Sequence, residues 1–279
     1  MSTGIAVQLA VDTFSAAALY ALVALAVSLA YSGSGVIHLA IGQVGLAGGL
    51  SAASLHAGGM PLLPAVLVGI AVGGALSGVA ERALVSPVIG KPMLGAGILL
   101  SAALLAQGVL AGIFRQPAYA FPSASGVYGF LGGIVHKYDL LTLATVAVVA
   151  GTSAMVIRSR RVGGSLRLTA RAPRLAERLG VPTAMVRTSS FVIGGVLATG
   201  AILLGAPRFP LVAAGVGALP LRGIAAAAAG RMVSPRRVAG AALLIAAAEV
   251  VGGYELTGGR GEFLCDAVAL VLVAAGWRR

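Results

Sequence analysis

Apolar runs of about 20 residues recur along the whole chain, and they constrain the fold more than any other feature of the sequence. A run of this length forms a helix that crosses the hydrocarbon core of a bilayer. Only helices and closed barrels satisfy their backbone polar groups in lipid. The sequence does not show the alternating segments of about 10 residues that build a barrel. It therefore predicts an all-α fold, a polytopic transmembrane helical bundle.

Composition supports a membrane protein and argues against a nucleic-acid partner. Hydrophobic residues make up 58% of the chain and charged residues only 10%, whereas soluble domains carry about 25% charged residues. A net charge of +12 would suit nucleic-acid binding. The arginines flank apolar runs, however, and membrane orientation explains them there.

Nine apolar segments are predicted, separated by glycine, proline and charged residues. They are Ile5–Tyr31, Val36–Leu55, Leu62–Ala80, Met93–Phe114, Leu140–Ile157, Thr188–Leu204, Leu211–Ala229, Val238–Val251 and Phe263–Trp277. Val36–Leu55 is weakly apolar and can form a broken or re-entrant helix, so we expect eight or nine membrane segments in a single domain, residues 1–279. Arg115–Tyr138 is expected to be a long loop whose aromatics suit an interfacial belt or a short external helix.

The most basic stretch, residues 158–187, holds eight of the twenty Lys and Arg residues. Alternating the nine segments from a cytoplasmic C-terminus places fifteen basic residues inside and four outside. Because basic residues resist translocation, this bias places the loop 158–187 in the cytoplasm. The N-terminus lies outside if all nine segments cross, and inside if one early segment is re-entrant.

This loop contains the signals of a short helix. Pro173 suits a first helical position, Gly180 suits the left-handed position after a last turn, and Pro182 prevents continuation. Leu175 and Leu179 are four residues apart and share one face. A second face is predicted to carry Arg171, Arg174 and Arg178. Such a helix is too short to cross a membrane, so it either rests on anionic lipid head groups or docks on a cytoplasmic partner.

A few polar residues lie within apolar segments and are candidates for a translocation path. His38 contacts a solute or is a packing residue, and Gly42 and Gln43 line the path or pack closely in a glycine-rich segment. Glu249 is an intramembrane carboxylate that pairs with Arg222 or reaches the outer interface.

Other charged residues have simpler expected roles. Asp12 and Asp266 are predicted near the membrane interfaces, and Glu81 and Arg82 are predicted to close a helix at the cytoplasmic face. One cysteine and three scattered histidines give no metal spacing or nucleophile triad, so an enzyme is not predicted. The sequence has no GxxxxGK[ST] loop, so ATP would need a partner subunit.

Three stretches, Leu19–Gly49, Glu81–Pro87 and Ser159–Gly194, carry a family resemblance in their order and spacing. The chain resembles the permease subunit of ABC importers of the branched-chain amino acid type, the LivH/LivM kind. It departs from that family at His38-Leu39, where the family has Asn-Phe, and at Gln43, where the family has Glu.

The resemblance implies that the short helix is a coupling helix that docks on an ATPase through the residues Arg171, Arg174, Leu175, Arg178, Leu179 and Gly180. It implies two cytoplasmic ATPase subunits that bind ATP, a second permease subunit and an extracytoplasmic substrate-binding protein. It also implies a multi-pass protein of the inner (cytoplasmic) membrane, in contact with lipid, with no cofactor of its own.

The cargo implied by the resemblance is a branched-chain or other apolar amino acid, although related permeases take urea and short amides. An alternative function is an ion- or proton-coupled secondary transporter that needs no ATPase. It would use intramembrane carboxylates such as Glu249 and Asp12 as coupling sites.

Overall fold

The computed structural model describes residues 3–115, 118–122, 126–130, 133–159, 162–208, 210–213, 215, 217–232, 234–256 and 260–277. The chain divides into two compact units. Unit 1 comprises residues 1–24, 122–152 and 221–279, and unit 2 comprises residues 25–121 and 153–220.

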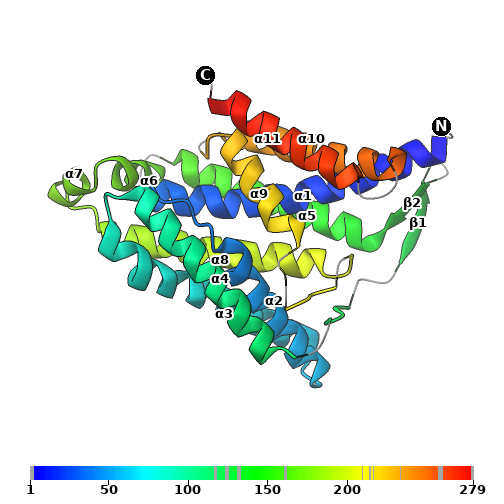
Figure 1. The fold of residues 1–279 in the computed structure, drawn as a ribbon, viewed down its shortest axis with the longest axis horizontal. Coiled ribbons are helices and arrows are strands. Elements are labelled where there is room, and N and C mark those ends of the chain that lie inside the picture. The colour runs from blue at the N-terminus through cyan, green and yellow to red at the C-terminus, as the bar shows by residue number, and fades with distance from the viewer. Residues whose placement is uncertain are drawn as a thin grey trace. The chain divides into compact units, whose positions relative to one another are not determined.

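Helices dominate the described part of the chain, as predicted (Figure 1). They are α1 Thr3–Ser34, α2 Ile41–Ala57, α3 Leu62–Ala80, α4 Pro92–Ile113, α5 Lys137–Arg158, α6 Val162–Arg171, α7 Pro173–Arg178, α8 Thr183–Gly205, α9 Ala218–Ala229, α10 Pro235–Glu255 and α11 Arg260–Trp277. Among the described residues, six helices are long and apolar enough to cross a membrane. The chain is therefore a multi-pass membrane protein.

The predicted segments and the helices agree closely, with three differences in extent. The second segment gives a helix of only 17 residues, α2, and the seventh gives the 12-residue helix α9. The sixth segment gives α8, which begins at Thr183 rather than at Thr188, because Pro182 precedes it and residues Thr183–Arg187 are already helical. The count of eight or nine membrane segments stays a prediction.

Close packing of small residues holds α2, α3 and α8 together in unit 2. A Cβ atom on Gly69 of α3 would lie 2.5 Å from the backbone oxygen of Gly48 on α2. A Cβ atom on Gly195 of α8 would lie 2.4 Å from the backbone oxygen of Gly73 on α3. Gly69 and Gly73 are four residues apart, a spacing that is typical of close helix contacts in lipid.

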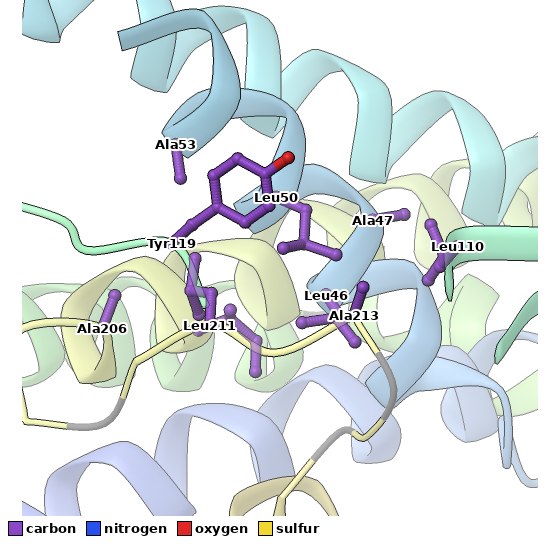
Figure 2. Packing of buried hydrophobic residues seen from close by; sticks show 10 residues of the cluster. Leu46, Ala47, Leu50, Ala53, Leu110, Tyr119, Ala206, Leu211 and Ala213 are labelled. Carbon is purple, nitrogen blue, oxygen red and sulfur yellow. The ribbon is translucent and has the colours of Figure 1, made fainter. Parts of the chain in front are cut away.

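A second part of the unit 2 core forms where two connecting segments pack on α2. Tyr119 and Leu211 pair through their backbones, with N–O distances of 2.9 and 3.1 Å. Figure 2 shows the Tyr119 ring beside Leu50 of α2. Ala206, Ala213 and Leu110 belong to the same buried cluster. The connections that follow α4 and α8 are therefore parts of the core.

Unit 1 contains the first part of α1, most of α5 and α9, and the helices α10 and α11. The last two helices lie side by side (Figure 1) and meet at Gly252 and Gly261. The Ser15 hydroxyl of α1 donates a hydrogen bond of 3.0 Å to Asp139 at the start of α5. Small residues thus bring helix backbones together in this unit as well.

The prediction of a loop or short helix before α5 is wrong for residues 127–130 and 133–136. Strand β1, Val127–Phe130, pairs antiparallel with β2, Gly133–His136. Valine, isoleucine and aromatic residues favour a pleated ribbon over a short helix. The Gln8 side-chain oxygen accepts a hydrogen bond from the backbone N–H of Ile134, which fixes the hairpin to α1 within unit 1.

Candidate functional site

The basic loop 158–187 folds into two short helices, and one expectation about it is wrong. Arg171 is the last residue of α6, and Ala172 interrupts the helix with φ −146° and ψ 68° before α7 begins. Arg171 therefore belongs to a different helix from Arg174 and Arg178. The restriction that a proline places on the residue before it explains the interruption at Ala172. Arg160 and Arg161 lie outside the described residues.

Helix α7 forms where the proline and glycine signals predicted it. Pro173 stands in its first turn, and Gly180 has a φ of +77° directly after its last turn. Leu175 is 50% exposed and Leu179 is 64% exposed. Arg174 and Arg178 are exposed beside them, whereas Ala176 is fully buried. The helix thus rests on a buried alanine and presents leucine and arginine side chains outward.

Polar contacts attach α7 to the start of α8. The Thr183 hydroxyl donates a hydrogen bond of 2.8 Å to Oε1 of Glu177. The backbone N–H of Val181 donates to the carbonyl oxygen of Ala176 at 3.0 Å. One side-chain hydrogen bond and one backbone hydrogen bond therefore stabilise the turn between α7 and α8.

Glu81 directly follows Ala80, the last residue of α3, where a helix end was predicted, but the chain stays helical beyond it. Glu81 begins a π-helical segment, Glu81–Val85, that continues α3, and its side chain is only 1% exposed. Nε of Arg187 on α8 donates to Glu81 Oε1 at 3.1 Å, and the Thr188 hydroxyl donates to Oε2 at 2.6 Å. Both carboxylate oxygens thus have donors, and the buried charge is matched by a buried arginine.

His38 lies in the connection between α1 and α2, fully buried in unit 2. Its Nε2 lies 3.0 Å from the Ser77 hydroxyl of α3, and its ring stacks on Phe191 of α8 with centroids 4.7 Å apart. Gly42 is buried and Gln43 is half-buried in the first turn of α2. These three path candidates therefore lie close along the chain, and His38 is a packed residue in this conformation.

Arg222 and Glu249 form the ion pair that their apolar surroundings had suggested. Nη1 of Arg222 on α9 binds Glu249 Oε1 on α10. The Tyr20 hydroxyl of α1 donates to Glu249 Oε2 and accepts a hydrogen bond of 3.1 Å from Arg222. Asp266 on α11 lies nearby, with its Oδ1 3.8 Å from Nε of Arg222. Three helices of unit 1 are thus joined by one polar cluster, with a fourth beside it.

Sequence inspection did not identify several members of these clusters. Tyr20 stands in a long apolar run, where a hydroxyl within the bilayer is itself a signal of a hydrogen-bonded partner. Arg187 was counted only as one of the loop arginines. Its position five residues after Pro182, inside the first turns of an apolar helix, is the available sign that it is buried.

Comparisons with known proteins agree with this architecture. Residues 9–273 match the family described as "Branched-chain amino acid transport system / permease component". The fold is similar to a chain of PsaBC from Streptococcus pneumoniae, solved in complex with a Fab, with a TM-score of 0.52 and 15% identity. That similarity covers 95% of this chain and 90% of the other. A search of curated proteins found no match.

Proposed function

Because the chain belongs to the family of branched-chain amino acid transport permease components, we propose that it is the membrane-spanning subunit of an ATP-driven importer. It is a transport component and not itself an enzyme. Two ATPase subunits dock on the loop 158–187 from the cytoplasm and bind the ATP. A second permease subunit, a copy or a homologue, completes the path in the inner membrane, and an external binding protein delivers the solute.

The observation that carries this proposal is the exposed surface of α7. Two leucines four residues apart, Leu175 and Leu179, stand half or more exposed beside two exposed arginines. Apolar anchors flanked by charges are typical of protein docking surfaces, because the anchors supply affinity and the charges supply register. We therefore assign α7, with Gly180 ending it, as the coupling helix.

The contacts of unit 2 supply a route for the motion of the ATPases. Glu177 of α7 is bonded to Thr183, the first residue of α8. One turn further along α8, Arg187 and Thr188 hold Glu81 at the end of α3. A displacement of α7 therefore pulls on α8 and, through Glu81, on α3. Since π-helical segments often mark functional positions, Glu81–Val85 is where we expect α3 to bend.

The cargo that the family suggests is a branched-chain or other apolar amino acid. The path candidates are His38, Gly42 and Gln43 in unit 2 and Arg222 and Glu249 in unit 1. Because His38 is buried in this conformation, it would meet a solute only after α1, α3 and α8 separate around it. Arg222 and Glu249 already stand together as an intramembrane charge pair, which is the usual mark of a transport path.

The docking role is tested by placing charge on the anchors. Leu175→Asp and Leu179→Asp together should abolish co-purification with the ATPase subunits, because two carboxylates cannot be buried in an apolar groove. Val162→Asp is the matched control, since Val162 is an exposed apolar residue of α6 in the same loop. It should leave association and membrane insertion unchanged.

Unchanged association in the double variant would contradict the docking role and favour a helix that rests on lipid head groups. Transport by the chain alone in liposomes, without ATPase subunits or ATP, would instead support the secondary-transporter alternative.

A further inference from the structure

A groove of about 400 Å³ lies on unit 2, where α3 passes into its π-helical continuation and meets the start of α8. Its lining comprises Ala75, Gly78, Val79, Arg82, Ala83 and Thr188. The side chains that α3 and its continuation contribute are exposed. The floor is closed, because a Cβ atom on the buried Gly78 would lie 2.8 Å from a methyl group of Val192 on α8. The groove is therefore a depression in the surface of the α3–α8 pair.

An apolar stripe on α3 leads along the helix to this groove. Val68, Ala71, Ala75 and Val79 are spaced three or four residues apart, so they share one face, and all four are exposed. From Ala71 to Arg82 the helix rises about 16 Å at 1.5 Å per residue. One leaflet of a bilayer has a hydrocarbon depth of about 15 Å, half of the apolar core. The stripe therefore suits an acyl chain, with Arg82 at the level of the head group.

Arg82 is a cation that the described part of the chain leaves without an ion pair or hydrogen bond. The carboxylates in the sequence of unit 2 are Glu81 and Glu177. Both accept hydrogen bonds from residues of α8. The Thr188 hydroxyl donates to Glu81, so Arg82 is the donor that the groove offers to a ligand. Its guanidinium suits a phosphate, which it can bind through two parallel hydrogen bonds.

These features select one class of ligand. Inorganic phosphate would satisfy Arg82 but leave the apolar walls uncovered. A zwitterionic phospholipid would cover the walls, but its ammonium group would find no carboxylate in the groove lining. An anionic phospholipid satisfies both the walls and the arginine. The distribution of basic residues predicts a cytoplasmic position for this end of α8, and basic pockets between helices on that side of a membrane suit anionic head groups.

We propose that this groove binds one anionic phospholipid of the cytoplasmic leaflet, with its phosphate on Arg82 and an acyl chain along the apolar stripe of α3. The inference goes beyond the proposed transport function, because it depends on the membrane location of the chain and not on ATPase subunits. The lipid lies beside the contacts of Glu81 that join α3 to α8, so its binding stabilises that junction.

Native mass spectrometry of the purified full chain tests the site. Phosphatidylglycerol and phosphatidylcholine with the same acyl chains are titrated separately, and the Kd of the first bound lipid is measured for each. Phosphatidylglycerol should bind at least about fivefold more tightly, the effect of one arginine at an anionic surface. Equal affinity for the two lipids would overturn the proposal. Displacement of phosphatidylglycerol by an equal concentration of inorganic phosphate would also overturn it, because the acyl chain would then contribute nothing.

Matched variants connect this preference to the groove. Arg82→Gln should weaken phosphatidylglycerol binding about fivefold, whereas Lys91→Gln, a basic residue of the same predicted loop outside the lining, should not. Ala75→Trp should fill the groove and weaken binding, whereas Leu76→Trp, its neighbour outside the lining, should leave binding intact. All four side chains are exposed, so the variants should fold. Unchanged phosphatidylglycerol binding in Arg82→Gln or in Ala75→Trp would overturn the proposal.

A second copy of the chain is the other occupant that an exposed apolar stripe would accept. Oxidative cross-linking of Ala75→Cys in native membranes separates the two, since the native Cys265 is buried. A chain that stays monomeric on denaturing gels while its purified form prefers phosphatidylglycerol would support the lipid site. A disulfide-linked dimer through position 75 would show that a second copy covers the groove, and the lipid assignment would be wrong.

Discussion

Each compact unit holds a buried arginine against a glutamate, and the two pairs differ in what surrounds them. In unit 2, Glu81 receives Arg187 on one oxygen and Thr188 on the other, and both members of the ion pair are buried. In unit 1, Glu249 also has two donors, but its side chain is 23% exposed, and Arg222 lies 3.8 Å from a second carboxylate, that of Asp266.

This difference indicates that the two ion pairs have different roles. The unit 2 pair balances its charges and uses both oxygens of its carboxylate, so it suits a permanent joint between α3 and α8. The unit 1 pair leaves one buried donor nitrogen of Arg222 without a hydrogen-bond partner among the described residues, and a second carboxylate, Asp266, lies nearby. Substitutions in the two units should therefore differ in size and in kind.

The largest expected effect is the loss of Glu81. Glu81→Ala leaves Arg187 buried without its partner, and breaking a buried pair in this way costs about 3–5 kcal/mol. Glu249→Ala should cost less, because Arg222 retains Asp266 at 3.8 Å. Unfolding of the purified chain in mixed detergent micelles measures both.

The double variant Glu81→Met with Arg187→Met is the control for this comparison, since it removes both charges and should recover most of the lost stability. Equal losses in the free energy of unfolding for Glu81→Ala and Glu249→Ala would show that the two ion pairs contribute equally and would contradict the difference between the two units.

A smaller loss of stability is expected when the glycines that pack α8 against α3 are substituted. Gly195→Ala places a Cβ atom 2.4 Å from the backbone oxygen of Gly73, which cannot move aside without shifting a helix. We expect a loss of about 1–3 kcal/mol. In unit 1, Gly252→Ala places its Cβ 3.2 Å from Gly261, so a small adjustment should relieve it at lower cost.

Gly97→Ala on α4 is the matched control, because a Cβ atom there meets nothing within 4 Å. Its stability should stay near that of the parent chain or rise slightly, since alanine favours a helix. A larger loss for Gly252→Ala than for Gly195→Ala would reverse the ranking of the two units.

Much of the fold follows from local sequence. Apolar runs predicted the helices because the length of a span and its composition are properties of one segment. Pro173, Gly180 and Pro182 predicted α7 because helix ends depend on backbone preferences of single residues. The four-residue spacing of Gly69 and Gly73 favours a close helix contact, although it does not identify α2 and α8 as the partners.

Apart from the pairing of Arg222 with Glu249, the contacts that depend on tertiary packing were not predicted. The loop carries eight similar arginines, and only the packing of α8 on α3 shows that Arg187 is the one that meets Glu81. Tyr20 and Asp266 are brought to Arg222 from 202 and 44 residues away, respectively, so no local pattern links them. The β1–β2 hairpin was missed because four-residue strands are too short for their alternation to stand out.

The smallest expected effect tests whether Tyr20, Arg222 and Glu249 stabilise unit 1 cooperatively. Tyr20→Phe removes one donor to Glu249, which keeps Arg222 and is partly exposed. We expect a loss of about 0.5–1.5 kcal/mol. In a Glu249→Gln background the same substitution should cost less, because the tyrosine then loses only a hydrogen bond to a neutral group. A double-mutant cycle on unfolding measures this coupling. Equal costs in both backgrounds would mean that Tyr20 stabilises α1 by packing alone, and the unit 1 cluster would then reduce to an Arg222–Glu249 pair with Asp266 beside it.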